Sequence, residues 1–196
     1  MQKLFYITLA LLATMMPAML TSCSETTDED TEYADWQSRN DTYFTSIYNQ
    51  AGTHIANGET NWKVIRCYTK DPETVDPTDY IVAEVLTEST DNTSPLFTDS
   101  VKVHYRGTLM PSASYPSGYQ FDSSWTGDYN LNTMMPSSGI TSGYIDGFST
   151  ALMNMHQGDR WRVYIPYALG YNTTEKTGIP AYSTLVFDLT LVKTWR

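Results

Sequence analysis

The sequence predicts an α+β domain in which one antiparallel sheet wraps around a single short helix. The first observation is a helical stripe in residues 144–158, where Phe148, Ala151, Leu152 and Met155 recur at i, i+3, i+4 and i+7. Gly158 stands where a glycine often ends a helix. The second is that most segments after residue 60 alternate apolar and polar side chains and are rich in Val, Tyr, Phe and Thr, as strands are. The third is an extra helical pattern before the first strand.

Residues 1–22 form a processing signal, with one cation at Lys3 and an apolar run from Leu4 to Leu20. The tetrapeptide that ends at Cys23, Leu-Thr-Ser-Cys, resembles the lipobox of bacterial lipoproteins. This resemblance implies cleavage before Cys23, acylation of its sulfur, and anchoring to a membrane of the cell envelope. The expected membrane is the outer one, at its periplasmic face or at the cell surface. A plain secretory signal or an uncleaved anchor are the alternatives, but Pro17 interrupts a run already marginal for a membrane span.

Residues 23–32 are expected to form a flexible tether. After Cys23 this segment is polar and acidic and contains no apolar residue that could be buried. It resembles the surface-export signal of some Bacteroidetes lipoproteins, although an ordinary solvated linker explains the same composition.

Residues 33–60 are predicted to be a helical segment. Tyr43, Phe44, Ile47 and Tyr48 follow a helical rather than a strand spacing, and Gly52 is a candidate C-terminal cap. This helix either packs on the sheet or pairs with a second copy of the chain, and the sequence leaves both open.

The chain carries 12 basic and 22 acidic residues, a formal net charge of −10, which argues against a nucleic-acid partner. With Cys23 acylated, Cys67 has no partner for a disulfide, and we expect it to be a small buried hydrophobe. The three histidines are far apart in sequence and stand near no other ligand-type cluster, so we expect no metal site. No cofactor is implied.

Six strands follow in the predicted order Trp62–Tyr68, Tyr80–Leu86, Val101–Arg106, Phe121–Trp125, Trp161–Ile165 and Leu185–Leu191. The stretches 110–120 and 126–143 are expected to be irregular. Alternation places Tyr105 inward and His104 and Arg106 outward. In the last strand it places Asp188 and Thr190 outward.

The residues by themselves offer no nucleophile system. Ser149 lacks the second glycine of a nucleophile elbow and falls inside the predicted helix, so it is expected to be a surface serine. Instead, five aromatic residues and one carboxylate converge: Tyr105, Phe121, Phe148, Tyr171, Phe187 and Asp122. Such a cluster is either ordinary core or the lining of a concave apolar pocket.

We expect residues 61–196 to form one domain, and its larger part carries a family resemblance. The motifs Val-Lys-Val-His-Tyr-Arg-Gly at 101–107, Phe-Asp-Ser-Ser at 121–124, Ile-Asp-Gly-Phe at 145–148, Ile-Pro at 165–166 and 179–180, and Thr-Leu-Val-Phe-Asp at 184–188 resemble those of the FKBP-type peptidyl-prolyl isomerases. They occur in the same order and span about residues 94–196. The resemblance implies an antiparallel sheet around one helix, in agreement with the pattern above.

The resemblance implies an aromatic pocket for a proline ring. Phe148 takes the position of the pocket floor, where the family frequently has tryptophan. Tyr105, Phe121 and Phe187 match the walls.

The polar edge of that pocket also follows from the resemblance. The Ile145 N–H and the Tyr171 hydroxyl are expected to hold substrate carbonyls, and Asp122 to border the rotating amide. Tyr144 and Ile179 match further substrate-binding positions. Longer loops and Asn172, where the family usually has glycine, depart from the pattern.

The implied function is the isomerisation of Xaa-Pro bonds in extracytoplasmic polypeptides, which would help proteins of the envelope to fold. Twisting the bond removes amide resonance, so an apolar, water-poor pocket favours the twisted state without a metal or a covalent intermediate. Two alternatives remain open. One is a peptide-binding or chaperone module that has lost catalysis, and the other is a glycan-binding lipoprotein, suggested only by 15 Tyr and 5 Trp.

Overall fold

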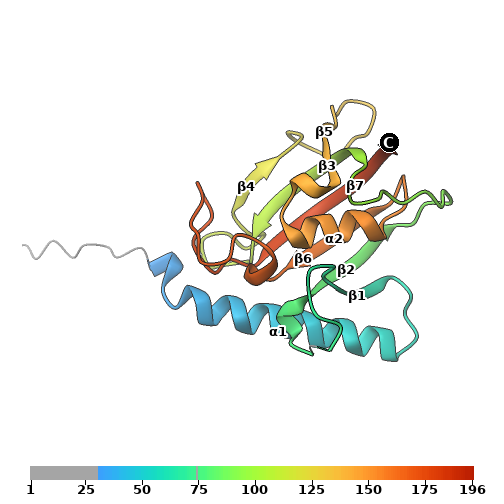
Figure 1. Cartoon of the computed structure of the whole chain (residues 1–196). Coiled ribbons are helices and arrows are strands. Elements are labelled where there is room, and N and C mark those ends of the chain that lie inside the picture. The colour runs from blue at the N-terminus through green and yellow to red at the C-terminus, as the bar shows by residue number, and fades with distance from the viewer. Residues whose placement is uncertain (1–30, 74) are drawn as a thin grey trace, which may run out of the picture.

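The computed structural model describes residues 31–73 and 75–196. The expectations for the signal at 1–22, for Cys23 and for residues 24–30 lie outside these residues. Within them the α+β prediction is confirmed: a seven-stranded antiparallel sheet holds a short helix on one face and a long helix on the other (Figure 1).

The strands are β1 (Trp62–Arg66), β2 (Tyr80–Thr87), β3 (Ser100–Leu109), β4 (Gln120–Ser123), β5 (Ser137–Ile140), β6 (Arg160–Ile165) and β7 (Leu185–Trp195). The α-helices are α1 (Trp36–Ala56) and α2 (Asp146–Asn154), and the 3-10 helices are η1 (Thr31–Tyr33), η2 (Pro77–Asp79), η3 (Thr141–Gly143) and η4 (Tyr167–Leu169). The strand order is β1-β2-β6-β7-β3-β4, and β5 also pairs with β3.

All six predicted strands form, with ends that differ by a few residues. The sequence missed β5, which pairs with the first four residues of β3. Its Ser-Ser-Gly-Ile sequence has no alternation of apolar and polar residues, so only its partner strand defines it.

The inner face of the sheet packs against α2. Ala151, Leu152 and Met155 are completely buried, and Phe148 almost completely. The predicted helix is too long, however, because α2 ends at Asn154 and Met155 is its extended C-cap. Gly158, at φ +100°, lies in the following turn and donates its N–H to the Leu191 carbonyl, so it does not cap the helix.

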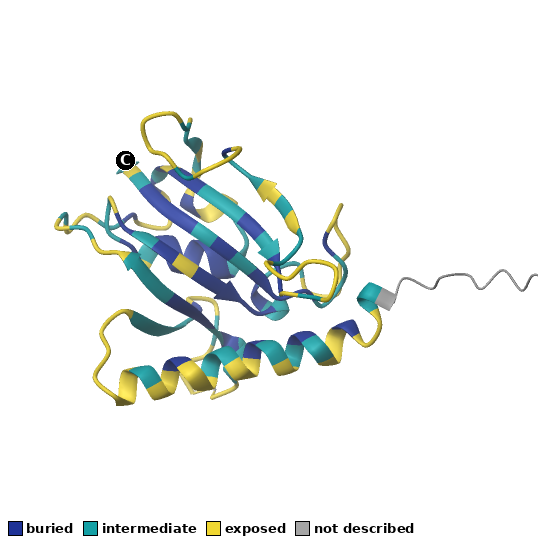
Figure 2. Ribbon diagram, turned by 180° about the vertical axis from the view of Figure 1, so that it is seen from behind, coloured by how far each residue is buried: buried dark blue, intermediate teal, exposed yellow. Residues whose placement is uncertain are grey.

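The outer face of β2 and β6 packs against α1, which crosses it at the bottom of Figure 2. Phe44 and Ala51 are buried there with Val82 and Tyr164. This answers the open question about the helix in favour of packing on the sheet. The predicted cap at Gly52 is wrong, since the helix continues to Ala56 and Asn57 caps it.

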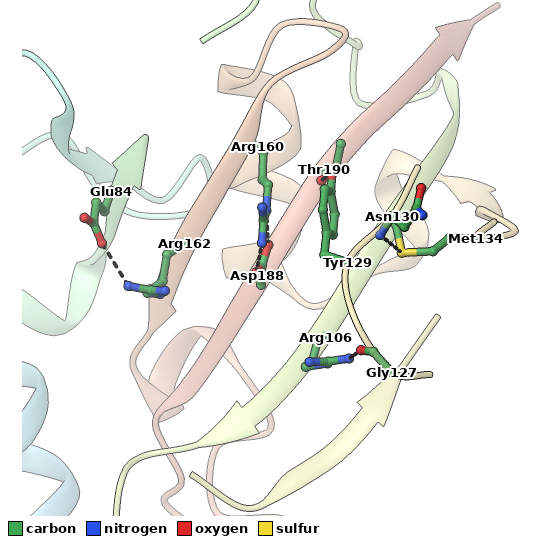
Figure 3. Close-up of polar contacts among 10 residues, drawn as sticks. All are labelled: Glu84, Arg106, Gly127, Tyr129, Asn130, Met134, Arg160, Arg162, Asp188 and Thr190. Carbon is green, nitrogen blue, oxygen red and sulfur yellow. Dashed lines mark hydrogen bonds and ion pairs between the residues drawn. The ribbon is translucent and has the colours of Figure 1, made fainter. Parts of the chain in front are cut away.

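A second layer covers the outer face beyond α1. The segment after β4 lies over β3 and β7. There the Trp125 ring packs edge-on against His104. The Tyr129 hydroxyl hydrogen-bonds to Thr190 Oγ1 at 2.8 Å (Figure 3). His104 and Thr190 are therefore buried, contrary to the outward, solvent-facing positions that alternation predicted.

The folded body begins earlier than predicted. Glu32, which we placed in the flexible tether, belongs to η1, and its carbonyl accepts a 2.7 Å hydrogen bond from Arg39. Cys67 is buried and free, as predicted, and accepts a hydrogen bond from Thr150 Oγ1.

Among the described helices, none combines the length and the apolar character needed to cross a membrane. No group of three or more potential metal-ligating side chains occurs in residues 31–73 and 75–196.

Candidate functional site

A cavity of about 240 Å³ opens on the inner side of the sheet, beside the N-terminus of α2. Nine residues line it: Tyr105, Phe121, Asp122, Gly143, Tyr144, Ile145, Phe148, Tyr171 and Phe187. The structure thus brings together eight of the nine pocket residues named from the sequence. Gly143 is the additional one. It stands where many family members have an acidic residue or glutamine, but the sequence did not place it in the cavity wall.

Most aromatic rings of the cavity pack edge to face, and one pair stacks. Phe148, on the first turn of α2, meets Phe187 of β7 at a centroid distance of 5.0 Å and an interplanar angle of 84°. Phe187 meets Phe121 of β4 at 5.7 Å, and Tyr144 stacks on Phe148 at 4.7 Å. Such contacts stabilise ring positions beyond their burial, so the walls of the cavity are preformed.

Gly107 of β3 makes this packing possible. A Cβ at this position would lie 2.5 Å from the Phe121 ring and 2.8 Å from the Phe187 ring. Only glycine leaves room for both rings against the strand.

One hydrogen bond defines the polar edge of the cavity. The Tyr105 hydroxyl donates to Asp122 Oδ2 at 2.7 Å, and Asp122 Oδ1 accepts the Ser123 N–H at 2.8 Å. Burial and then the Asp122 carboxylate raise the pKa of Tyr105 above its ordinary value, so its hydroxyl remains a donor at neutral pH. Burial followed by the same carboxylate raises the pKa of Tyr171.

Two residues just before α2 line the cavity on the side of that helix. Tyr144 and Ile145 have extended backbones, and Ile145 is the N-cap, so its N–H precedes the hydrogen-bond ladder of the helix. On the far side, the Lys176 ammonium lies 5.7 Å from the centre of the Tyr171 ring.

Two sequence expectations fail near this site. Ile179 does not line the cavity but is buried in the core, where its carbonyl accepts the Lys176 N–H. Ser149 is fully buried rather than exposed, because its hydroxyl donates to the Thr141 carbonyl at 2.7 Å and ties α2 to η3. Ser149 thus fastens the helix that carries Phe148.

Comparison with known proteins identifies the family. Residues 92–192, more than half of the chain, match the family model described as FKBP-type peptidyl-prolyl cis-trans isomerase. The chain belongs to this family. The FKBP match contains every residue that lines the cavity.

Curated relatives agree with the FKBP assignment. The macrophage infectivity potentiator of Trypanosoma cruzi is 34% identical over 122 residues, which are 62% of this chain and 56% of that protein. The FKBP-type isomerase FkpA of Escherichia coli K12 is 34% identical over 99 residues, 50% of this chain and 32% of that protein. The chain therefore spans between about a third and a little over half of these relatives.

Solved structures give the same fold. A peptidyl-prolyl isomerase from Pseudomonas syringae superposes with a TM-score of 0.51 at 25% identity, covering 78% of this chain and 96% of that one. The three FKBP domains of wheat FKBP73 give a TM-score of 0.52 at 23% identity, over 68% of this chain and 51% of that one. The second likeness supports the FKBP fold alone.

The arrangement limits the chemistry that the cavity can support. It offers apolar rings, one carboxylate already held by two donors, tyrosine hydroxyls and a backbone N–H. These groups can enclose an apolar ring and hold carbonyl oxygens, which suits conformational rather than covalent chemistry.

Proposed function

We propose that this chain is a peptidyl-prolyl cis-trans isomerase that acts on proline-containing polypeptides outside the cytoplasm. The observation that carries the proposal is the preformed aromatic cavity with a single polar edge, formed by Tyr105 and Asp122. FKBP family membership supports the same activity.

In the proposed mechanism, different walls of the cavity contact different parts of the substrate. The proline ring enters over Phe148, between Tyr105 and Phe187, and loses contact with water. The twisted amide has less resonance and a less polar carbonyl than the planar one, so this environment lowers its free energy relative to the planar forms. The Ile145 N–H and the Tyr171 hydroxyl hold the flanking carbonyls, and Asp122 keeps Tyr105 in place.

The test is the cis-to-trans isomerisation of a short Xaa-Pro peptide by purified residues 24–196. Phe187→Ala, which removes a wall, and Asp122→Ala, which removes the polar edge, are expected to slow the catalysed reaction at least about tenfold. Circular dichroism of each variant separates this effect from unfolding. A folded wild-type chain that gives only the background rate would overturn the catalytic proposal and favour a peptide-binding module, whose suppression of aggregation would survive Asp122→Ala.

We further propose that the chain is a lipoprotein of the cell envelope, anchored through Cys23. The support is the sequence before it, in which an apolar run ends in Leu-Thr-Ser-Cys. Labelling of cells with an alkyne-bearing palmitate analogue should tag the wild-type chain and leave Cys23→Ser untagged. Tagging of both would place the lipid elsewhere.

A further inference from the structure

A second cavity, of about 340 Å³, lies on the outer face of the sheet. Its floor consists of two rows of neighbouring residues on three paired strands, and these rows are Arg162–Asp188–Arg106 and Tyr164–Val186–Thr108. Since successive strand residues point to opposite faces, Arg106 and Asp188 stand behind Tyr105 and Phe187 of the aromatic cavity. Strands β3 and β7 therefore separate two cavities.

The walls of this outer cavity come from segments beyond the sheet. They include Tyr43 of α1, and Pro111 and Ser117 of the loop after β3. Helix α1 lies outside the residues that match the FKBP family model. The cavity thus has one lining residue, Tyr43, from a helix outside the matched region.

The carboxylate in the floor is already paired. Arg160 donates to Asp188 from Nε, at 2.8 Å to Oδ1, and from Nη2, at 2.6 Å to Oδ2 (Figure 3). The centre of the Tyr129 ring lies 3.7 Å from the guanidinium carbon. Such a bidentate pair leaves little of the Asp188 charge for other partners. Asp188 therefore does not serve as a counter-ion for Arg106 or Arg162.

Arg106 lacks a counter-ion. In the described part of the chain no carboxylate lies within 4.0 Å of its guanidinium, whose Nη2 donates to the Gly127 carbonyl at 2.7 Å (Figure 3). Its Nε is buried and has no acceptor among these residues. An unmatched buried donor costs free energy, which an incoming acceptor would recover.

Arg162 is held only weakly by its counter-ion, Glu84. Its contact with Glu84 is 3.2 Å long, and 44% of the arginine side chain is exposed, so the pair contributes little. The cavity therefore presents one excess positive charge in a chain whose formal net charge is −10.

We propose that the outer cavity binds a small carboxylate that carries an apolar body. The carboxylate lies between Arg106 and Arg162, and the body lies against Val186, Tyr164 and Tyr43. One excess positive charge matches a singly charged carboxylate better than a doubly charged phosphate. The volume falls within the range of small-molecule sites. The source is either a free acid or the C-terminal residue of a polypeptide, because both present the same chemistry.

The test compares 4-phenylbutyrate with its neutral amide by isothermal titration calorimetry on residues 23–196 carrying Cys23→Ser. The acid is expected to bind at one site, and the amide at least about tenfold more weakly, the loss expected for a charge-assisted hydrogen bond. Arg106→Met and Arg162→Met should each weaken binding by a similar factor. Lys102→Met, an exposed cation on the same strand, is the matched control and should change nothing.

One further variant sharpens the result. Glu84→Gln should tighten binding, because it releases Arg162. If Arg106→Met disturbs the loop at Gly127, Arg162→Met, at a more exposed site, still tests the proposal. Equal binding of acid and amide, no binding, or binding that survives Arg162→Met would overturn the proposal.

A second comparison identifies the source of the carboxylate. Tighter binding of N-acetyl-Ala-Phe than of 4-phenylbutyrate, lost on C-terminal amidation, would assign the ligand to polypeptide ends. The reverse order would assign it to free acids.

Discussion

The Tyr105 hydroxyl links the fold to the proposed function, because its hydrogen bond to Asp122 forms the polar edge of the cavity. Tyr105→Phe removes its 2.7 Å hydrogen bond and leaves Asp122 with the Ser123 N–H alone. We expect a three- to tenfold lower isomerisation rate, estimated from the value of one hydrogen bond, and a loss of about 1 kcal/mol in unfolding free energy. Tyr115→Phe, an exposed tyrosine elsewhere, is the control. An unchanged rate in Tyr105→Phe would remove the polar edge from the mechanism.

Single residues show where sequence reasoning succeeded and where it stopped. Alternation along β3 and β7 was enough to bring Tyr105 and Phe187 to one face, because strand geometry fixes that face. It failed for His104, whose strand position was right but whose face is covered by Trp125. Burial depends on segments distant in sequence, which no local pattern reveals.

At the scale of elements, the contact between β3 and the aromatic walls depends on one glycine. Gly107→Ala should push the Phe121 and Phe187 rings outward, destabilise the fold by about 1–3 kcal/mol as overpacking does, and lower activity. Gly52→Ala is the matched control, because a Cβ there meets nothing within 4 Å and α1 should gain about 0.5–1 kcal/mol. Urea denaturation measures both. Equal stability of Gly107→Ala and wild type would show that the rings move freely.

A buried amide attaches α1 to the segment before β7. Asn40 Oδ1 accepts the Thr184 N–H at 2.7 Å, while its Nδ2 donates to the Trp36 carbonyl. Asn40→Ala leaves a buried backbone donor without an acceptor, so we expect a loss of about 2–3 kcal/mol in unfolding free energy. Thr42→Ala, on the exposed side of the same helix, should cost far less. A similar loss in both variants would mean that helix propensity, rather than this attachment, stabilises α1.

The elements themselves were only partly predictable. The stripe in 144–158 located α2, but its end was wrong because the extended Met155 still buries its side chain and so continues the helical pattern. Gly52 suggested an end for α1, yet four further residues continue the helix to Ala56. A helix ends where the backbone leaves the helical conformation. A glycine permits that change but does not require it.

At the scale of the whole molecule, two cores on opposite faces of one sheet bury several tyrosines wholly or in part. Burial is the first cause that raises the pKa of each of these phenols: Tyr43, Tyr105, Tyr144, Tyr164 and Tyr171. The family motifs located the inner core, which holds α2. The outer core and its cavity could not be predicted, because the side of the sheet that α1 covers is set by packing alone.

These tyrosines predict how stability depends on pH. Below their ordinary pKa of 10.0, both folded and unfolded chains keep the phenol protons, so this contribution is constant. Above pH 10 the unfolded chain releases them while the folded chain retains them, so unfolding becomes more favourable as pH rises toward each folded-state pKa. The slope reaches at most about 1.4 kcal/mol per pH unit for each tyrosine, less for those partly exposed.

Urea denaturation at pH 8, 10 and 11 measures this loss, and absorbance at 295 nm reports phenolate. In the folded chain the buried tyrosines should ionise only together with the loss of near-ultraviolet circular dichroism, whereas in 8 M urea all should titrate near pH 10. Tyr43→Phe and Tyr164→Phe should each flatten the decline, because each removes one buried phenol from the side of the sheet that α1 covers. Ionisation of every tyrosine near pH 10 in a chain that stays folded and equally stable would contradict the burial from which the argument starts.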